Sequence, residues 1–387
     1  MADGRKALIV GAGIGGLTAA LALREAGIDA TIFEQAPRLQ DVQAGGGLLV
    51  WNNGMRALRE IGLHEEAEKS AAVLDVTTFN SYKGDVLATW PIDRVARDLG
   101  VPTVGVVRGD LHRVLANALG EDTVEVGAHY ESFTTDNGGV TVRFSDGREE
   151  HADLLVGADG VRSTVRVDLL GRADLRPPGY WGIQAVVDFE HPAAHHGHFA
   201  TYWGPGSRFA YHHVGGGRLY WFAVEDGEGN EPATERIRIV RERLKDWPEP
   251  VPSIVAATPD EEIAVMDIAD AKPVKQWGTG PATLLGDAAH PILPNLGQGT
   301  SQALEDAIVL ADALQKGPDV VTALRSYERR RAPRTKGLVN FSRNLGRIGR
   351  FKKRPAVAFR ERFMKVGLSR FGFKQATALT SYDFLKD

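Results

Sequence analysis

The chain has 387 residues, of which 43% are hydrophobic and 25% are charged, and its formal net charge is −4. This length predicts two or three domains in an ordinary globular protein, and the charge balance argues against nucleic acid as a partner. Because the chain contains no cysteine, disulfide bonds, thiolate metal sites and thiol redox chemistry are excluded.

Signals for a membrane, for export and for a metal are also absent from the sequence. No apolar run is long enough for a transmembrane segment. The first predicted strand begins by Lys6, so we expect no signal peptide and a cytoplasmic location. No HExxH motif, histidine pair or carboxylate cluster indicates a metal, and nothing indicates the oligomeric state.

The N-terminal stretch has the pattern of a dinucleotide-binding unit. A strand is predicted over residues 6–10, a helix to about residue 26, and a second strand over residues 30–34, with GAGIGG between the first strand and the helix. Strand, GxGxxG, helix, strand and an acidic residue about 20 positions on form the fingerprint for this kind of site. The pattern does not distinguish NAD from FAD.

Each glycine of this loop has an expected task. Gly11 permits the turn, Gly13 lets a pyrophosphate reach the backbone, and Gly16 lets the helix pack on the strand. Glu34 is expected to bind the ribose hydroxyls. The predicted cofactor ligands here are Gly11, Gly13, Ile14, Gly15, Gly16, Glu34 and Gln35.

Further candidates follow in residues 45–110. Gly47 closes a run of three glycines before a predicted strand over residues 48–50, and we assign it to the cofactor site. Residues 73–79 and 86–90 are expected to form two strands joined by a turn. Arg108 precedes a predicted helix with Asp110 as its N-cap, and its guanidinium suits a phosphate or ribityl chain. A surface ion pair is the alternative for this arginine.

A second strand-to-glycine-loop element is predicted over residues 152–166. Its strand ends in the tetrapeptide GADG at residues 157–160. Asp159 is therefore expected at the carboxyl end of a buried strand, beside the nucleotide crevice.

From residue 180 to about residue 266 the pattern changes to β-segments rich in aromatic residues. We predict a second domain whose sheet covers the crevice. Alternation makes Arg208 and His212 share one face, with Tyr220 on the paired strand. Aromatic walls with a few polar groups suit a flat apolar ligand, although an ordinary half-buried sheet core is the alternative. Arg208 on such a wall needs an anion or a phenolic oxygen as a partner.

Residues 286–300 carry the most informative motif, GDAAHPILPNLGQGT. Asp287 follows a predicted strand over residues 282–285 and can accept hydrogen bonds from ligand hydroxyls. Two prolines stiffen the loop, and the start of a predicted helix over residues 300–314 suits a negative charge. The expected cofactor ligands are Gly286, Asp287, Gly297, Gln298, Gly299 and Thr300, and Pro291 is a candidate catalytic residue.

The C-terminal part of the chain is basic. Residues 327–334 are predicted to be helical and rich in arginine, and residues 342–374 carry many Arg and Lys with hardly any acid. This pattern fits an acidic partner, a membrane surface or a solvated helical face, and the last is the commonest of the three.

Taken in order, three motifs resemble those of the single-component (class A) FAD-dependent aromatic monooxygenases, which have the para-hydroxybenzoate hydroxylase fold. They are the GxGxxG loop with Glu34, the GADG tetrapeptide, and residues 286–299. Arg108 and residues 327–334 fit the same family. The chain is most similar to its salicylate-hydroxylase-like, flavin-type urate-hydroxylase-like and zeaxanthin-epoxidase-like branches. One departure is Thr300-Ser301, where relatives usually carry Ala followed by Asn, Cys or Ser.

The resemblance implies an α/β fold. A Rossmann-like FAD-binding domain is expected from residues 1–72, 100–176 and 272–340, and an α+β substrate domain on a mostly antiparallel sheet from residues 73–99 and 177–271. A C-terminal helical segment is expected over residues 341–387.

The implied activity is that of a monooxygenase with FAD as cofactor and NADPH or NADH as transient co-substrate. It acts with O₂ on an aromatic or polycyclic small molecule, which it hydroxylates or epoxidises through a flavin C4a-hydroperoxide. Arg208, His212 and Tyr220 are expected to assist the substrate by hydrogen bonding. The alternative is an FAD-dependent reductase or dehydrogenase without oxygen transfer. A flavin-dependent halogenase is disfavoured because its Trp-x-Trp-x-Ile-Pro segment is absent, and a pure binding module has no need for Asp159 and Asp287.

Overall fold

A parallel sheet forms the centre of one half of the molecule, which the computed structural model describes over residues 4–43, 45–120, 123–136, 138–171 and 175–386. Its strands run in the order β20-β12-β1-β2-β8, and every neighbouring pair is parallel. The central strands are continuous apolar runs because both faces of the sheet are covered. The bounds are β1 (Lys6–Val10), β2 (Asp29–Glu34), β8 (Val124–Val126), β12 (Leu154–Gly157) and β20 (Ala282–Leu284).

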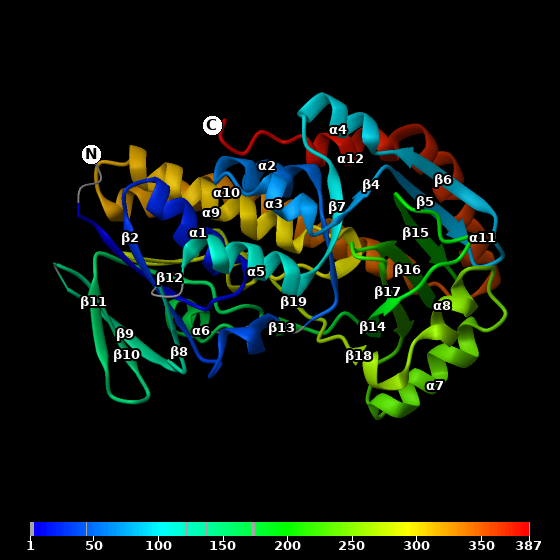
Figure 1. The fold of residues 1–387 in the computed structure, drawn as a ribbon, viewed down its shortest axis with the longest axis horizontal. Helices are drawn as coiled ribbons and strands as arrows, with labels where there is room; N and C mark the ends of the chain where they lie inside the picture. Colours follow the sequence, from blue (N-terminus) through cyan, green and yellow to red (C-terminus); the bar gives the residue numbers. More distant parts are fainter. Residues whose placement is uncertain (1–3, 44, 121–122, 137, 172–174, 387) are drawn as a thin grey trace.

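Helices from both ends of the chain pack around this parallel sheet (Figure 1). The N-terminal helix α1 (Ile14–Glu25) contacts α5 (Arg108–Leu119) and α9 (Gly299–Lys316), and α9 contacts α10 (Val320–Gly349). Three further helices, α2 (Asn52–Glu60), α3 (His64–Lys69) and α6 (Thr164–Leu170), lie in the same half. One apolar core joins these helices to the sheet, so residues near both ends of the chain complete a single folding unit.

The other half is built on a larger sheet, which we call the aromatic sheet. Its order is β18-β14-β17-β16-β15-β5-β6, and all neighbouring pairs are antiparallel except β15 and β5. Helices α7 (Ala233–Leu244) and α8 (Val251–Ala257) cover one of its faces. The strands are β5 (Val76–Ser81), β6 (Val86–Pro91), β14 (Tyr180–Asp188), β15 (His198–Trp203), β16 (Ser207–His213), β17 (Arg218–Asp226) and β18 (Ala264–Val265).

Smaller elements connect the two halves. The sheet β3-β7-β4, here called the covering sheet, comprises β3 (Gly47–Val50), β7 (Thr103–Val107) and β4 (Ala72–Leu74). The other sheets are β11-β10-β9, of β9 (Tyr130–Asp136), β10 (Gly139–Phe144) and β11 (Glu149–Ala152), and the pair β13 (Leu175–Arg176) and β19 (Asp270–Ala271). The short helices are η1 (Leu39–Gln43), α4 (Asp93–Leu99), η3 (Asp260–Glu262), η4 (Gly286–Ala288) and η5 (Pro294–Leu296).

The chain ends in a nearly continuous helix. It consists of α11 (Arg354–Phe363), a π-helical stretch η6 (Met364–Gly372) and α12 (Phe373–Thr380). The π-helical stretch packs against β6 at the edge of the aromatic sheet.

The predicted fold class is confirmed: a parallel α/β unit, a mostly antiparallel second sheet and C-terminal helices. The domain boundaries stay a prediction. The expected segments also contain residues 1–3, 44, 121–122, 137, 172–174 and 387, which lie outside the described ranges. Within those ranges no helix is long and apolar enough to cross a membrane. No group of three or more His, Cys, Asp or Glu among the same residues is arranged to hold a metal ion.

Two local predictions were wrong. The run 73–79 is not one strand, because the chain leaves β4 after Leu74 and enters β5 at Val76, in a different sheet. Asp110 is not an N-cap, because α5 already begins at Arg108 with Val107 as the capping residue. The Asp110 carboxylate instead pairs with Arg113 and with Arg218 of β17.

Candidate functional site

The glycine loops that follow β1 and β12 touch each other at the carboxyl edge of the parallel sheet. Gly11 has φ 105°, and a Cβ there would lie 2.6 Å from the carbonyl oxygen of Ala158. A Cβ on Gly16 would lie 2.0 Å from the carbonyl oxygen of Gly11. Both positions therefore require glycine for close backbone approach, the reason for which the sequence singled them out.

Two helices begin at this edge with unpaired backbone N–H groups. The N-caps of α1 and α9 are Gly13 and Gln298, and neither helix start has a side-chain cap. Among the described residues, and apart from its own chain neighbours and helix backbone, nothing lies within 4 Å of the place where a Cβ on Gly13 or on Gly299 would stand. Open space in front of uncapped helix starts suits a negatively charged ligand, because the free N–H groups and the helix dipole both favour it.

Three charged candidates share this crevice. Glu34 accepts hydrogen bonds from the backbone N–H groups of Ala12 at 2.8 Å and Ala36 at 2.9 Å. Burial lowers the pKa of the Arg108 guanidinium, and the negative charges of Asp287 and Glu34 oppose that shift. Arg108 also donates to the carbonyl oxygen of Val42. These interactions place the side chains of Glu34, Arg108 and Asp287 around one space.

Asp287 lies in the short helix η4 and is an exposed residue between buried neighbours. The surrounding protein raises its pKa, and the positive charges of His290 and Arg108 act in the opposite direction. Because the residue is exposed, Asp287 is available to accept hydrogen bonds from a ligand.

Other predicted cofactor ligands are already bonded within the protein. Asp159 accepts hydrogen bonds from the Ser163 hydroxyl at 2.5 Å and from the Thr164 and Val165 N–H groups at 2.7 and 3.2 Å, so it holds the start of α6. The Gln298 side chain is buried and bonds to Asn53 and Gln302. Ile14 is buried and Gln35 is exposed. Gly15 and Thr300 lie in the first turns of α1 and α9, Gly286 lies in η4, and Gly297 follows η5.

A buried charged network lies behind the Asp287 loop. Asp306 of α9 accepts hydrogen bonds from the Gly286 N–H at 2.9 Å and from Arg331 of α10 at 2.6 Å, and it lies 2.5 Å from His290. Burial favours the neutral form of Asp306, yet His290 and Arg331 hold its carboxyl pKa below the usual range. Glu305 pairs with Arg331 and also with Arg334, at 2.7 Å. The arginines of the predicted basic segment are therefore largely counter-ions for carboxylates of α9.

One face of the aromatic sheet points toward the covering sheet. Strand register places His212 opposite Tyr220 and Ala210 opposite Phe222. Residues of the other face, including Phe209 and Tyr211, belong to the core beneath α7 and α8. The predicted alternation along β16 is therefore confirmed.

Tyr220 and Gln184 lie at a close contact between the aromatic sheet and the start of β3. The Tyr220 hydroxyl donates to the Gln184 side-chain oxygen at 2.8 Å. A Cβ on Gly47 would lie 2.4 Å from Cγ of Tyr220, and a Cβ on Gly46 would lie 2.6 Å from the Gln184 oxygen. Glycine at positions 46 and 47 thus lets β3 lie directly on the aromatic sheet.

His212 also lies where the aromatic sheet meets the covering sheet, and its side chain is buried. Its Nδ1 donates to the carbonyl oxygen of His213 at 3.0 Å. Burial lowers the pKa of the His212 ring to about 4. At neutral pH the ring is therefore uncharged, with Nε2 as its acceptor nitrogen.

Arg208 is fixed at the other end of this face. Its guanidinium donates to the Asn295 side-chain oxygen at 2.5 Å and lies over the rings of Trp203 and Tyr180. The Tyr180 hydroxyl donates to the same Asn295 oxygen at 3.1 Å. Asn295 belongs to the loop that also contains the buried Pro291, so Arg208 connects the aromatic sheet to that loop. The structure brings Arg208, His212 and Tyr220 onto one face and places Pro291 on a loop that meets that face.

Four residues with these contacts were missed by the sequence analysis. Gln184 is a lone amide in an otherwise apolar stretch of β14, and that pattern was a usable signal. Asn295 lies between Pro294 and Leu296 in a loop, where nothing in the sequence marks its contacts. His112 donates from Nε2 to the Ala12 carbonyl at 2.8 Å, and Arg166 donates to the carbonyls of Ala288 and Ala289 at 2.9 Å each. All three bonds join segments that are more than 90 positions apart in the chain.

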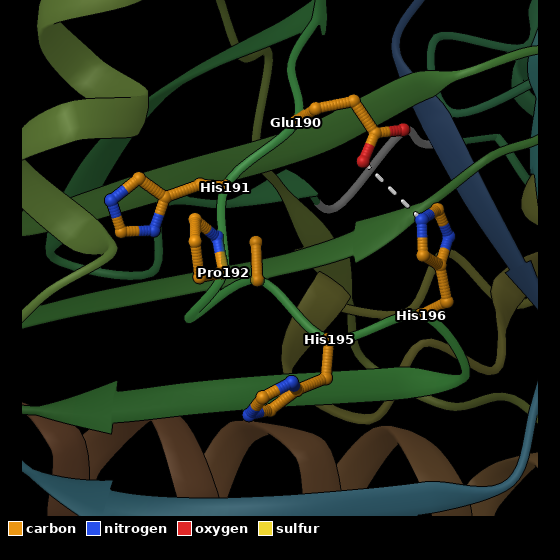
Figure 2. Close-up of a pocket in the computed structure, with 6 residues that line it drawn as sticks. Glu190, His191, Pro192, His195 and His196 are labelled. Carbon is orange, nitrogen blue, oxygen red and sulfur yellow. Dashed lines mark ion pairs between the residues drawn. The ribbon is translucent and has the colours of Figure 1, made fainter.

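A separate open hollow of about 440 Å³ is lined by Glu190, His191, Pro192, Ala194, His195 and His196 (Figure 2). Its Glu190 and exposed His196 side chains form an ion pair at 3.4 Å. His196 stacks on His213, which points to the opposite face of β16 from Arg208 and His212. The hollow therefore lies away from the crevice between the two sheets.

Comparison with known proteins identifies close relatives of the chain. Residues 5–342 match the family described as FAD binding domain. Aurachin C monooxygenase/isomerase of Stigmatella aurantiaca is 37% identical over 95% of each chain. FAD-dependent urate hydroxylase of Klebsiella pneumoniae is 32% identical over 86% of this chain and 88% of that protein. The chloroplastic zeaxanthin epoxidase of Oryza sativa is 33% identical over 84% of this chain, which spans 52% of that longer protein.

A solved structure shares the whole arrangement. Klebsiella pneumoniae HpxO, complexed with FAD and uric acid, superposes with a TM-score of 0.91 at 27% identity, over 97% of each chain. A point variant of the same protein, complexed with FAD, superposes with a TM-score of 0.89 over 97% of this chain and 99% of that one.

Proposed function

The chain belongs to the class A FAD-dependent monooxygenase family, and from this premise we propose that it uses NADH or NADPH and O₂ to hydroxylate or epoxidise an aromatic or polycyclic small molecule. One observation carries the proposal: Gly46 and Gly47, beside the nucleotide crevice, lie directly on Tyr220 and Gln184 of the aromatic sheet. A cofactor in the crevice and a flat substrate on the sheet are thereby brought together.

The residues at the crevice fit FAD. Open space at Gly13 and Gly299, in front of uncapped helix starts, is suited to phosphate oxygens and to an electron-rich ring edge. We assign the ribose hydroxyls to Glu34 and further ligand hydroxyls to Asp287, with Arg108 as a donor to the phosphates or the ribityl chain. Bound FAD supplies the electron transfer and the oxygen chemistry.

The other tasks fall to side chains near the aromatic sheet. Arg208 orients the substrate through its positive charge, and neutral His212 offers an acceptor for a phenolic proton. Pro291 and the surrounding apolar side chains exclude water from the reacting atoms. We further propose that residues 73–99 and 177–271, which contain the strands of the aromatic sheet, form a substrate domain distinct from the FAD-binding segments.

The first experiment is to measure NADH and NADPH consumption in air by the FAD-loaded protein, with and without a panel of phenols, purines and polycyclic quinols. The expected result is that one ligand class accelerates consumption and yields an oxygenated product. Incorporation of oxygen from ¹⁸O₂ identifies the source of the new atom.

Two outcomes would contradict the proposal. A product that forms equally well without oxygen would identify a reductase of the same fold. Tight FAD binding with no coenzyme oxidation under any condition would identify a binding module.

A further inference from the structure

The nearly continuous C-terminal helix exposes three phenylalanines. The side chains of Phe359, Phe363 and Phe371 belong to residues that are 68%, 56% and 63% exposed. Single exposed apolar residues are ordinary, but large aromatic side chains gathered on one helix are not, because each leaves much apolar area in water. We call these three phenylalanines, with the Lys and Arg side chains of residues 352–374, the basic aromatic face.

The three phenylalanines form a single stripe. Phe359 and Phe363 are four positions apart, and their rings stack with centroids 6.5 Å apart. A Cβ on Gly367 would lie 3.6 Å from the Phe363 ring, so the glycine continues the stripe at the same spacing toward Phe371. Helical residues four apart are neighbours on one side of a helix.

Positive charge surrounds the stripe. Residues 352–374 contain eight Lys and Arg but one acidic residue, in a chain whose net charge is −4. Within the described part of the chain, most of these cations make no ion pair, in contrast to the arginines of α10. The unpaired cations are Lys353, Arg354, Arg362, Lys365, Arg370 and Lys374.

The opposite side of the helix is anchored to the protein. Arg360 is buried and donates to the carbonyl oxygens of Gly204 at 3.0 Å and Trp203 at 3.2 Å. The Trp90 indole donates to the carbonyl oxygen of Leu368 at 3.0 Å, and Met364 is buried against Leu87 and Trp203. The helix therefore stays in place without help from the exposed phenylalanines, which are free to contact another body.

We propose that the basic aromatic face docks the protein onto an anionic membrane surface. Aromatic side chains of an amphipathic helix insert at the level of the lipid headgroups, and unpaired Lys and Arg side chains pair with anionic lipids. A second copy of the chain would bring the same positive charge onto this face, which disfavours self-association there. Helix α11 lies at the rim of the molecule, beyond the aromatic sheet (Figure 1). The proposal is independent of the proposed activity.

The test is sedimentation of the full-length, FAD-loaded protein with vesicles of phosphatidylcholine, with and without phosphatidylglycerol. Binding is expected to vesicles that contain phosphatidylglycerol and to weaken as salt is added. The F359S/F363S/F371S variant should lower the partition coefficient by more than about ten-fold, because the apolar area that enters the interface is lost. Neutralising Arg362, Lys365 or Arg370 with glutamine should lower it by about five-fold per charge.

Matched controls alter exposed residues elsewhere. The V126S/V265S/V321S and K272Q/K275Q variants remove apolar and positive groups outside the face, and they should bind vesicles like the parent protein. Flavin content and thermal unfolding confirm that all variants are folded. No sedimentation at low salt, or binding that is unchanged in both the phenylalanine and the glutamine variants, would overturn the proposal. A dimer in solution that the phenylalanine variant converts to a monomer, without vesicle binding, would also overturn it.

Discussion

At the scale of single residues, Gly13 separates cofactor binding from folding. Beyond its chain neighbours, no part of the described structure lies within 4 Å of the position of its missing Cβ. A larger side chain therefore fits the protein but fills the space assigned to the pyrophosphate. We expect Gly13→Val to abolish FAD retention in a soluble, folded protein. The measurement is flavin content per chain after gel filtration. Gly337→Val, at an exposed helical glycine with equally open surroundings, is the matched control, and normal flavin content in Gly13→Val would refute the assignment.

Arg208 is expected to act on the substrate and not on FAD. Its removal leaves Asn295 without a charged donor and takes a positive charge from the face that carries His212 and Tyr220. Hydrogen bonds to charged groups contribute about 1.5–3 kcal/mol, so Arg208→Ala should lower substrate-stimulated kcat/KM by about ten-fold or more. FAD affinity should change little.

Steady-state kinetics and flavin titration measure the two effects on Arg208→Ala separately. Arg238→Ala removes an exposed arginine from α7 as the control. Equal loss of both properties in Arg208→Ala would identify a purely structural residue.

His212 predicts a loss of stability in acid. Its pKa is about 4 in the folded protein because burial disfavours the charged ring, and about 6.5 in an unfolded chain. The unfolded state therefore binds a proton first as the pH falls below 6.5. This one group should lower the free energy of unfolding by about 2 kcal/mol between pH 8 and pH 5.

Urea unfolding at the two pH values measures that loss. The loss of unfolding free energy between pH 8 and pH 5 should be smaller by about 2 kcal/mol in His212→Gln. It should be unchanged in His129→Gln, which alters an exposed histidine. An unchanged pH dependence in His212→Gln would show that this ring does not resist protonation.

These residues also show where sequence reasoning ends. Alternation along β16 is a local property, so it correctly placed Arg208 and His212 on one face. The contact of His212 with Gly105, where a Cβ would lie 2.3 Å from Nδ1, depends on how two sheets pack. Nothing near position 212 in the sequence encodes it.

At the scale of elements, α9 and α10 are joined by buried ion pairs that support the Asp287 loop. Arg331 is 1% exposed and pairs with both Glu305 and Asp306. Removing one partner from a buried pair leaves uncompensated charge and costs about 3–5 kcal/mol. Arg331→Met should therefore lower the free energy of unfolding by this amount and weaken FAD binding, because Asp306 also holds the Gly286 N–H.

Arg329 provides the comparison for this prediction. It is the exposed arginine two positions earlier in the same helix, and Arg329→Met should change stability by less than about 0.5 kcal/mol. Urea unfolding of both variants measures the difference. If Arg331→Met and Arg329→Met unfold at similar urea concentrations, the buried ion pairs between α9 and α10 do not support the fold.

Strand boundaries were predicted less well than strand existence. The alternating residues 73–79 fit one strand, but the chain changes sheets at Asp75, whose N–H bonds to the carbonyl of Gly197. The segment beside which β4 ends and β5 begins thus lies more than 100 residues away in the chain. Glycine loops and helix starts carry local signals, whereas a change of pairing partner does not.

At the scale of the whole molecule, the C-terminal segment connects both halves. After α12 the chain returns to the parallel half, where Phe384 is 2% exposed in the main core and Arg330 donates to its carbonyl oxygen at 3.2 Å. Phe384→Ala should cost about 3–5 kcal/mol of stability. Phe359→Ala, at an exposed phenylalanine of the same segment, should be nearly neutral.

Thermal unfolding of these two phenylalanine variants tests whether the tail is part of the fold. If Phe384→Ala is as stable as the parent protein, the C-terminal tail does not contribute to the folded core. The sequence predicted a helical C-terminal segment but no entry of its last residues into the core. That entry brings Phe384 under the guanidinium of Arg56, which lies more than 300 positions away in the chain.

The position of β20 in the parallel sheet sets an order for synthesis of the protein. Residues 282–284 form an edge strand beside β12, and α9 then packs on α1. A nascent chain on the ribosome therefore carries an open, apolar edge at β12 while more than 100 further residues are made, and this interval invites chaperone binding or aggregation. All strands of the aromatic sheet precede β20 in the chain. A growing chain can therefore complete the cofactor crevice only once β20 and the start of α9 have been made.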